Sequence, residues 1–232
     1  MSTMSMARQP IFSSKLDIVG YELLYRPPVN SAQGAFDGEL ATSSVLARAF
    51  MDLDPGSIVG EHKVFVNFTS SLLLSGAART LSSEHLVVEV LEDVVVDELI
   101  VEAVRQLVDE GYTIALDDFV YSPMWDPLLE IAHIVKLDVL ALGMDGLRQQ
   151  LRMIERFDVK LLAEKIETSE EYEACRQLGF HYFQGFFLCR PSAVVGEGLE
   201  DDKGSVLGLL SKAHDLAASL DQFNVLIRRD PP

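Results

Sequence analysis

The sequence has few cysteines, few aromatic residues and a shortage of positive charge. Its 232 residues include 2 cysteines, 1 tryptophan and 8% aromatic residues, and 19 Lys and Arg stand against 36 Asp and Glu, for a net charge of −17. Cys175 and Cys189 fit neither a disulfide framework nor a metal-ligand spacing, so we expect reduced thiols in a cytoplasmic protein. Such an acidic surface repels phosphate backbones, which argues against general nucleic acid binding. A small anionic ligand is still compatible with this charge, because a bound metal ion inverts the charge of a local site.

Long hydrophobic runs are also missing. No stretch of about eighteen consecutive apolar residues occurs, and residues 1–8 contain no apolar run, so the sequence predicts neither a membrane span nor a signal peptide. Hydrophobic residues nevertheless make up 48% of the chain. A chain of this length and composition can build one large domain with a continuous core, or two small ones.

Short apolar runs alternate along the chain with longer segments in which apolar residues recur at helical spacing. The candidate strands are residues 18–24, 63–68, 85–90, 113–116, 133–137, 159–163 and 182–188. The candidate helices are residues 41–53, 97–109, 144–156 and 169–178. This alternation predicts parallel strands joined by right-handed crossovers, which both an open doubly wound sheet and a closed barrel provide.

Polar residues at the ends of the candidate strands favour the barrel. They are Glu22, Asn67, Glu89, Asp117, Lys136, Glu164 and Gln184. In a barrel the carboxyl ends of all strands meet at one mouth, where such enzymes place their chemistry, whereas an open sheet spreads them along a line. We therefore predict an α/β fold, a TIM-like (β/α)8 barrel over residues 1–191. Residues 192–232 have the composition of an acidic linker followed by an amphipathic helical tail.

The same strand-end residues predict a metal site. Carboxylate and amide oxygens are the ligands that Mg²⁺ and Mn²⁺ prefer, and the neighbouring Asp117 and Asp118 can reach two different ions, as two-metal phosphoryl chemistry requires. A pair of adjacent aspartates by itself is more often a solvated turn. Its position among other strand-end carboxylates favours the metal site. Lys136 agrees with this interpretation, because an ammonium inside an apolar strand needs carboxylate partners.

Seven segments resemble, in order, the motifs of the EAL domain family, which binds and cleaves the bacterial messenger cyclic di-GMP. They are GYELLYR (20–26), VN (66–67), EVLE (89–92), ALDDF (115–119), VKLD (135–138), AEKIET (163–168) and FQGF (183–186). Each motif alone is a weak signal, but seven in the family's order are specific. The resemblance covers about residues 8–191 and implies a phosphodiesterase that uses Mg²⁺ or Mn²⁺ to hydrolyse cyclic di-GMP to pGpG.

The resemblance also implies roles for single residues. The ligands of one ion would be Glu22, Asn67, Glu89 and Asp117, and those of a second ion Asp117, Asp118 and Glu164. Lys136 would orient or polarise the attacking water, and Gln184 would hydrogen-bond within the cluster. Ligand contacts would come from Leu24 and Arg26, and loop support from Glu92 and Glu167.

Some positions depart from the family's pattern. The loop after Phe119 lacks the expected glycines, and Leu23, Leu91 and Lys165 replace Ala, Thr and Gly of the motifs. These departures resemble the EAL domains that are joined to a C-terminal HDOD domain, and residues 223–231 resemble the start of such a domain. They leave a second function open, namely an impaired module that acts by binding cyclic di-GMP or a protein. The partners expected are a second copy of the chain or a signalling protein.

Overall fold

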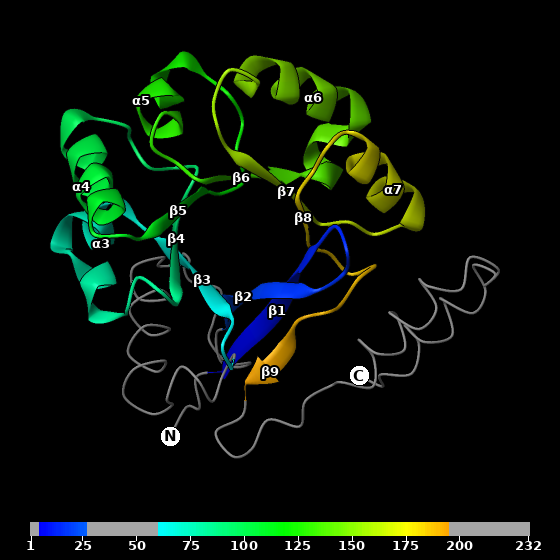
Figure 1. The fold of residues 1–232 in the computed structure, drawn as a ribbon, viewed down its shortest axis with the longest axis horizontal. Helices are drawn as coiled ribbons and strands as arrows, with labels where there is room; N and C mark the ends of the chain where they lie inside the picture. Colours follow the sequence, from blue (N-terminus) through cyan, green and yellow to red (C-terminus); the bar gives the residue numbers. More distant parts are fainter. Residues whose placement is uncertain (1–4, 27–59, 195–232) are drawn as a thin grey trace, which may run out of the picture.

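The computed structural model describes residues 5–26 and 60–194, which form a barrel of strands with helices outside it (Figure 1). The strands are β1 (Ser5–Ser13), β2 (Ile18–Arg26), β3 (Lys63–Phe68), β4 (Leu86–Val90), β5 (Thr113–Leu116), β6 (Ile134–Asp138), β7 (Lys160–Glu164), β8 (Tyr182–Phe183) and β9 (Ser192–Val194). The α-helices are α3 (Ser70–Ser75), α4 (Glu98–Asp109), α5 (Asp126–Leu129), α6 (Val139–Ile154) and α7 (Ser169–Gln177). Two short 3-10 helices are η1 (Ala77–Thr80) and η2 (Pro123–Trp125).

Strands β2 to β8 follow one another around the barrel, and β1 closes it. Each of β2 to β7 pairs in parallel with the next strand, whereas β1 pairs antiparallel with both β2 and β8. The TIM-like barrel predicted from the sequence is thereby confirmed. The sequence predicts no strand over β1, because Pro10 interrupts this run and proline is rare inside strands.

The sheet continues a little past the predicted domain boundary at Pro191. The 3-residue strand β9 pairs antiparallel with β1, with Ala7 opposite Ala193. Of the acidic linker and helical tail predicted for residues 192–232, residues 195–232 lie outside the described residues. The helix predicted over residues 41–53 lies outside them as well.

Three predicted helices are confirmed, and local capping explains where they begin. The Asp97 carboxylate accepts a hydrogen bond from the backbone N–H of Ile100 at 2.9 Å, which caps α4. Asp138 caps α6 in the same way through Ala141, at 2.9 Å. Helix α6 therefore begins at Val139, earlier than its hydrophobic spacing predicts. It is interrupted at Gly143, whose φ of 59° is not helical.

Side chains along each strand alternate between the helix-covered outside of the barrel and its interior. An apolar interior cluster consists of Ile11, Phe65, Val87, Ala115, Ile134 and Leu162. Two residues further along β3, β4, β6 and β7, the same face carries polar side chains, which are Asn67, Glu89, Lys136 and Glu164. The interior is therefore layered, and an apolar layer supports a polar layer at the carboxyl end of the barrel.

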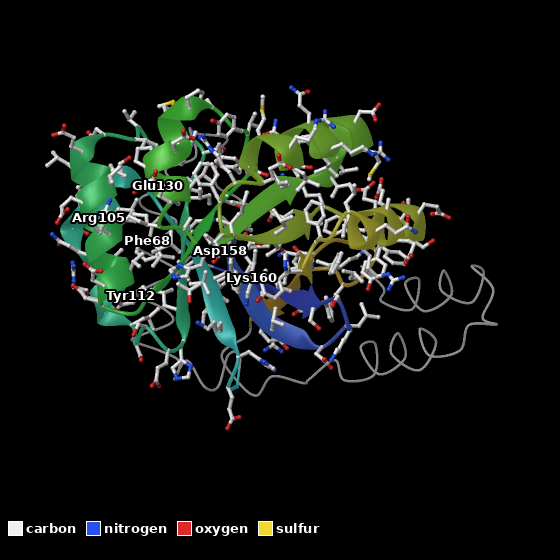
Figure 2. All side chains as sticks on the ribbon, turned by 45° about the horizontal axis from the view of Figure 1, so that its top comes forward. Phe68, Arg105, Tyr112, Glu130, Asp158 and Lys160 are labelled. Atoms are coloured by element: carbon white, nitrogen blue, oxygen red, sulfur yellow. The ribbon has the colours of Figure 1, made fainter. Side chains whose placement is uncertain are left out.

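A second, larger apolar cluster lies between the sheet and the helices. Figure 2 shows Phe68 between the strands and α4, with Arg105 on the outer side of this helix. Cys175 is buried and Cys189 is half-buried, and no disulfide joins them. Among the described residues, no helix has the length and apolar character needed to cross a bilayer.

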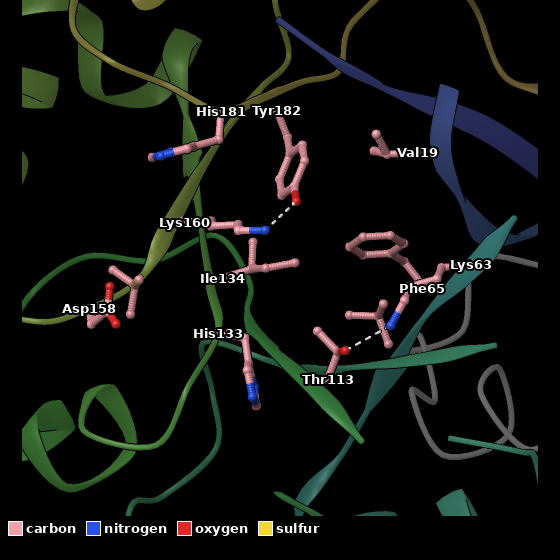
Figure 3. A pocket seen from close by; sticks show the side chains of 12 residues that line it. Val19, Lys63, Phe65, Thr113, His133, Ile134, Asp158, Lys160, His181 and Tyr182 are labelled. Atoms are coloured by element: carbon pink, nitrogen blue, oxygen red, sulfur yellow. Dashed lines mark hydrogen bonds between the residues drawn. The ribbon is translucent and has the colours of Figure 1, made fainter. Parts of the chain in front are cut away.

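The amino-terminal end of the barrel contains a cavity of about 500 Å³ (Figure 3). In it, Lys63 Nζ donates a hydrogen bond to Thr113 Oγ1 at 2.9 Å, and Lys160 Nζ donates one to the Tyr182 hydroxyl at 3.1 Å. Both lysines stand at the first residue of their strands. They are thus separated by the apolar layer from the polar residues at the carboxyl ends.

Candidate functional site

The carboxyl ends of the strands bring together the seven strand-end residues predicted from the sequence. Their contacts join all of them into one cluster: Glu22, Asn67, Glu89, Asp117, Lys136, Glu164 and Gln184. All except Asn67 are buried. Their convergence follows from strand alternation and barrel closure together, because each side chain comes from a different strand or from the residue directly after it, with Glu22 in the middle of the long strand β2.

Lys136 lies at the centre of this cluster and is fully buried. Its Nζ lies 2.5 Å from Glu89 Oε1, 2.7 Å from Asp117 Oδ1 and 3.0 Å from Glu164 Oε1. Glu22 Oε1 is more distant, at 3.9 Å. One ammonium group is therefore surrounded by four carboxylates.

Burial and charge together change the proton affinity of Lys136 and of the three glutamates around it. Burial lowers the pKa of Lys136, but the charges of the surrounding carboxylates outweigh it and hold the pKa well above its usual value. For Glu89 and Glu164, burial raises the pKa well above the usual 4.5, and the charge of Lys136 compensates only in part. Burial also raises the pKa of Glu22. The cluster needs further positive charge to keep its carboxylates ionised.

The oxygen atoms around Asn67 fit a hard cation. One atom of its side-chain amide lies 3.1 Å from Glu89 Oε2 and 3.2 Å from Asp117 Oδ2. The amide can donate hydrogen bonds to both carboxylates, or it can turn its oxygen toward them. In that second orientation the amide oxygen lies from each carboxylate oxygen at the spacing of adjacent ligands around an octahedral Mg²⁺, which is about 3 Å.

Two further oxygens of the cluster have unused hydrogen-bonding capacity. Glu164 Oε2 and Gln184 Oε1 are buried without a hydrogen-bond partner among the described residues. In this part of the chain, no three His, Cys, Asp or Glu side chains are already arranged as a metal site. Lys136 Nζ lies between the carboxylates, so a metal ion would bind beside this ammonium and draw on the unsatisfied oxygens.

Gln9 belongs to the site, although the sequence does not indicate it. Gln184 Nε2 donates a hydrogen bond to Glu22 Oε2 at 2.7 Å and a longer one to Gln9 Oε1 at 3.4 Å. Gln9 in turn donates to the carbonyl oxygen of Cys189 at 3.0 Å. Sequence reasoning misses Gln9 because it lies on β1, next to the proline that obscures this strand.

Asp118 lies at the edge of the cluster and is bound by Lys165. The Lys165 Nζ donates hydrogen bonds to Asp118 Oδ1 at 3.0 Å and to Asp138 Oδ2 at 2.5 Å. The backbones of Asp118 and Lys165 both have positive φ, at 39° and 56°. The sequence indicates Lys165 only as a departure from a glycine, and it does not indicate Asp138 as a partner.

A cavity of about 350 Å³ opens over the cluster. Leu24, predicted to contact the ligand, and Glu167, predicted to support a loop, line it together with Leu140 and Phe186. Leu140 and Phe186 are 50% and 45% exposed, so they offer apolar surface at the mouth. The exposed Glu92 does not line the cavity. The Arg26 side chain lies outside what the structure describes.

The loop that follows Phe119 is anchored to the core. Trp125, whose role the sequence leaves open, is buried and packs edge-on against Phe119 with ring centroids 5.7 Å apart. The backbone N–H of Phe119 donates to the carbonyl oxygen of Lys136 at 3.0 Å. Tyr121 is held through its backbone N–H, which donates to the side chain of a buried glutamine on α6 at 2.7 Å.

Comparison with known proteins agrees with this site and fold. The sequence model described as "EAL domain" matches residues 35–191. The chain is 36% identical over 197 residues to the cyclic di-GMP phosphodiesterase CdgJ of Vibrio cholerae, covering 84% of this chain and 46% of that protein. It is 33% identical over 229 residues to the uncharacterized protein YuxH of Bacillus subtilis, covering 97% of this chain and 56% of YuxH. The chain thus spans about half the length of these curated relatives.

A solved structure shows the same fold. The complex of Klebsiella pneumoniae BlrP1 with calcium and cyclic di-GMP matches with a TM-score of 0.66, covering 82% of this chain and 56% of that one. At 20% sequence identity this likeness supports the fold alone. The family match extends over more than half of the chain, and the CdgJ match over most of it. The chain therefore belongs to the EAL domain family.

Proposed function

We propose that the chain hydrolyses one phosphodiester bond of cyclic di-GMP to give pGpG, using a divalent metal ion at the carboxyl end of the barrel. The observation that carries this proposal is the excess of buried carboxylates around Lys136. Such an excess costs stability unless a cation or bound protons offset it. The family, and the activity named for the V. cholerae relative, indicate the substrate.

Four oxygen donors would hold the ion, namely Glu22, Asn67, Glu89 and Asp117. They are oxygen ligands of the kind that Mg²⁺ and Mn²⁺ prefer, and the calcium in the K. pneumoniae complex supports the use of a divalent ion. When bound, such an ion lowers the pKa of a water ligand and neutralises charge on the phosphoryl group. A second ion at Asp118 is not part of this proposal, because that carboxylate binds the Lys165 ammonium.

The chain's own residues would orient the reaction. The charge of Lys136 offsets part of the burial that raises the pKa of Glu89 and Glu164, and Lys136 would orient the attacking water. Gln184 holds Glu22 through the 2.7 Å hydrogen bond, which fixes the direction in which the other oxygen of this carboxylate points. Glu164 has a free buried oxygen that can accept a proton or a hydrogen bond from water.

The mouth of the cavity would bind the guanine bases. Leu24, Leu140 and Phe186 provide apolar and aromatic surface beside the acidic cluster, and the flat face of Phe186 is suited to stacking on a base. Arg26 would contact a phosphate, as guanidinium groups do well. An anionic substrate can enter this acidic site only together with a cation, which makes binding dependent on the metal.

The proposal extends to location and assembly. We infer a cytoplasmic protein, since cyclic di-GMP acts inside bacteria, and a homodimer formed through the loop after Asp118. In that loop Val120 and Met124 are 56% and 52% exposed, which is unusual for large apolar side chains and suits a contact surface. Sedimentation of the wild-type chain and of a Val120→Ser/Met124→Ser double variant measures this contact directly.

The first experiment is hydrolysis of cyclic di-GMP by the purified chain with Mn²⁺ or Mg²⁺, with pGpG followed by chromatography. We expect turnover in the wild type and at least a hundredfold loss in Glu22→Ala, because a metal ligand is removed. Lys15→Ala, which removes an exposed charge outside the site, serves as the control. Folded wild-type protein that binds cyclic di-GMP without cleaving it would contradict the proposal and favour the impaired binding module.

A further inference from the structure

The ammonium group of Lys165 lies between two carboxylates at the rim of the metal cluster. Its Nζ contacts both oxygens of Asp118, at 3.0 and 3.3 Å, and Asp138 Oδ2 at 2.5 Å. Lys165 directly follows Glu164 at the end of β7, while Asp118 and Asp138 stand at the carboxyl ends of β5 and β6. The ammonium therefore joins the ends of three neighbouring strands on the same rim as the active-site cavity that it lines.

The backbone at this position has the conformation of a glycine. Lys165 has a φ of 56° and Asp118 a φ of 39°, and among the described residues Leu16 is the only other non-glycine residue with positive φ. This left-handed region is costly for residues with a Cβ atom. The loop is nevertheless held in place, because the backbone N–H of Ile166 donates to the carbonyl oxygen of Gln184 at 3.1 Å. Lys165 therefore places a cation at the rim while its backbone keeps the left-handed conformation that a glycine adopts easily.

The placement of this cation conflicts with a second metal ion. The family resemblance assigns Asp117, Asp118 and Glu164 to that ion, so Asp118 must be free to bind it. Here both oxygens of Asp118 already contact an ammonium group. The Lys165 ammonium donates these hydrogen bonds and a further one to Asp138, and a lysine placed between two carboxylates carries a positive charge. A protonated ammonium and a divalent ion repel each other at the same carboxylate.

We propose that the Lys165 ammonium takes the place of the second divalent ion, so that this chain binds one divalent ion, next to Asn67 and Glu89. The inference rests on the proposed metal site for that one ion. Asp118 and Asp138 then bind the Lys165 ammonium and not a metal ion. The rim keeps a positive charge beside the cavity, but the single charge of a lysine side chain replaces the double charge of an exchangeable ion.

The test is the number of Mn²⁺ ions bound by the metal-free protein, measured by equilibrium dialysis with elemental analysis and without substrate. We expect one ion in the wild type and two in Lys165→Gly, which removes the ammonium and relieves the left-handed backbone. Lys165→Gly/Asp118→Asn should return to one ion, because the freed ligand is lost again. Lys15→Gly, an exposed lysine outside the site, should leave the count at one, and thermal melts show whether each variant is folded.

Each outcome bears on the inference. Two ions in the wild type, or a single ion in folded Lys165→Gly, would overturn it while leaving the proposed metal site intact. No bound ion in the folded wild type would contradict the proposed metal site itself, and the inference with it. Glu22→Ala distinguishes these cases, because the one ion of the wild type should disappear in this variant.

Discussion

Lys136 shows how a single buried charge can organise a site. Its Nζ lies within 3.0 Å of carboxylate oxygens of Glu89 on β4, Asp117 after β5 and Glu164 on β7, and no part of it is exposed. A lysine without such partners would lose its proton or leave the interior. Carboxylates without the lysine would in turn have to bind protons, because several like charges cannot stay ionised together in a buried place. The lysine and the carboxylates are therefore a unit, and neither is stable alone.

Replacing Lys136 with methionine tests this dependence through pH. Glu22, Glu89 and Glu164 have pKa values that burial raises above 4.5, and loss of the ammonium raises them further. The folded state then binds more protons than the unfolded state above pH 4.5, so stability falls as pH rises. We expect Lys136→Met to cost about 3–5 kcal/mol near pH 8 and much less near pH 5, measured by urea unfolding.

Lys15→Met provides the matched control, because it removes an exposed lysine on the connection between β1 and β2. It should change stability by less than about 0.5 kcal/mol at either pH. An equal loss for Lys136→Met at pH 5 and pH 8 would show that the destabilisation comes from packing and not from uncompensated charge.

At the scale of elements, the ends of β7 and β8 depend on one close backbone contact. A Cβ atom added at Gly185 would lie 2.2 Å from both the backbone nitrogen and the carbonyl oxygen of Ile166. Two hydrogen bonds fix this approach, from Ile166 N–H to Gln184 at 3.1 Å and from Phe187 N–H to Ile166 at 3.0 Å. The contact holds Gln184 in the cluster, and it lies next to Lys165 in the chain. Only glycine fits here, for steric reasons.

Gly185→Ala should therefore weaken both stability and the site. We expect a loss of about 1–3 kcal/mol from the forced backbone shift, together with weaker Mn²⁺ binding as Gln184 moves away from Glu22. Gly146→Ala in α6 is the control, where the added Cβ meets only side-chain carbons of Leu142, at 3.2 Å or more, and alanine improves helix propensity. Thermal unfolding measures the stability of both variants, and titration with Mn²⁺ measures their metal affinity. A Gly185→Ala protein with the stability and Mn²⁺ affinity of the wild type would refute the steric argument.

At the scale of the whole molecule, the barrel depends on its first strand. β1 contacts both β2 and β8 and so turns an open sheet into a closed one. It also contributes Ile11, fully buried in the interior layer, and Gln9, which contacts Gln184. Closure brings the two ends of the described chain to the same site, since Gln9 and Gln184 are 175 positions apart in the sequence.

Truncating Ile11 measures how much the interior layer contributes to stability. Ile11→Ala leaves a cavity in a fully buried cluster, and we expect a loss of about 2–5 kcal/mol in the free energy of unfolding. Leu99→Ala on the outer side of α4, where the leucine is 67% exposed, should change it by less than about 0.5 kcal/mol. Urea unfolding of both proteins gives the comparison. Similar values for both would mean that the interior layer contributes little.

The hydrophobic periodicity of the sequence was sufficient to predict the parallel strands and the polar side chains that meet at their carboxyl ends. A side chain two positions beyond an interior apolar residue must point into the same interior, as Glu89 does beyond Val87 and Lys136 beyond Ile134. The order of the motifs then indicated the family. These features depend on residues close together in the chain, so they can be recognised in the sequence without a structure.

The sequence by itself therefore determined which side chains reach the carboxyl end of the barrel, and the tertiary structure alone decided their partners. The pairing of Lys165 with Asp118, 47 positions apart, depends on two left-handed backbone residues and on the spacing of three strands. Neither of these follows from a hydrophobic pattern. The role of Gln9 likewise depends on the antiparallel strand that closes the barrel. The physical reason is that alternation sets the direction of a side chain within its own strand, whereas contacts between loops are set by where the closed barrel brings the strand ends together.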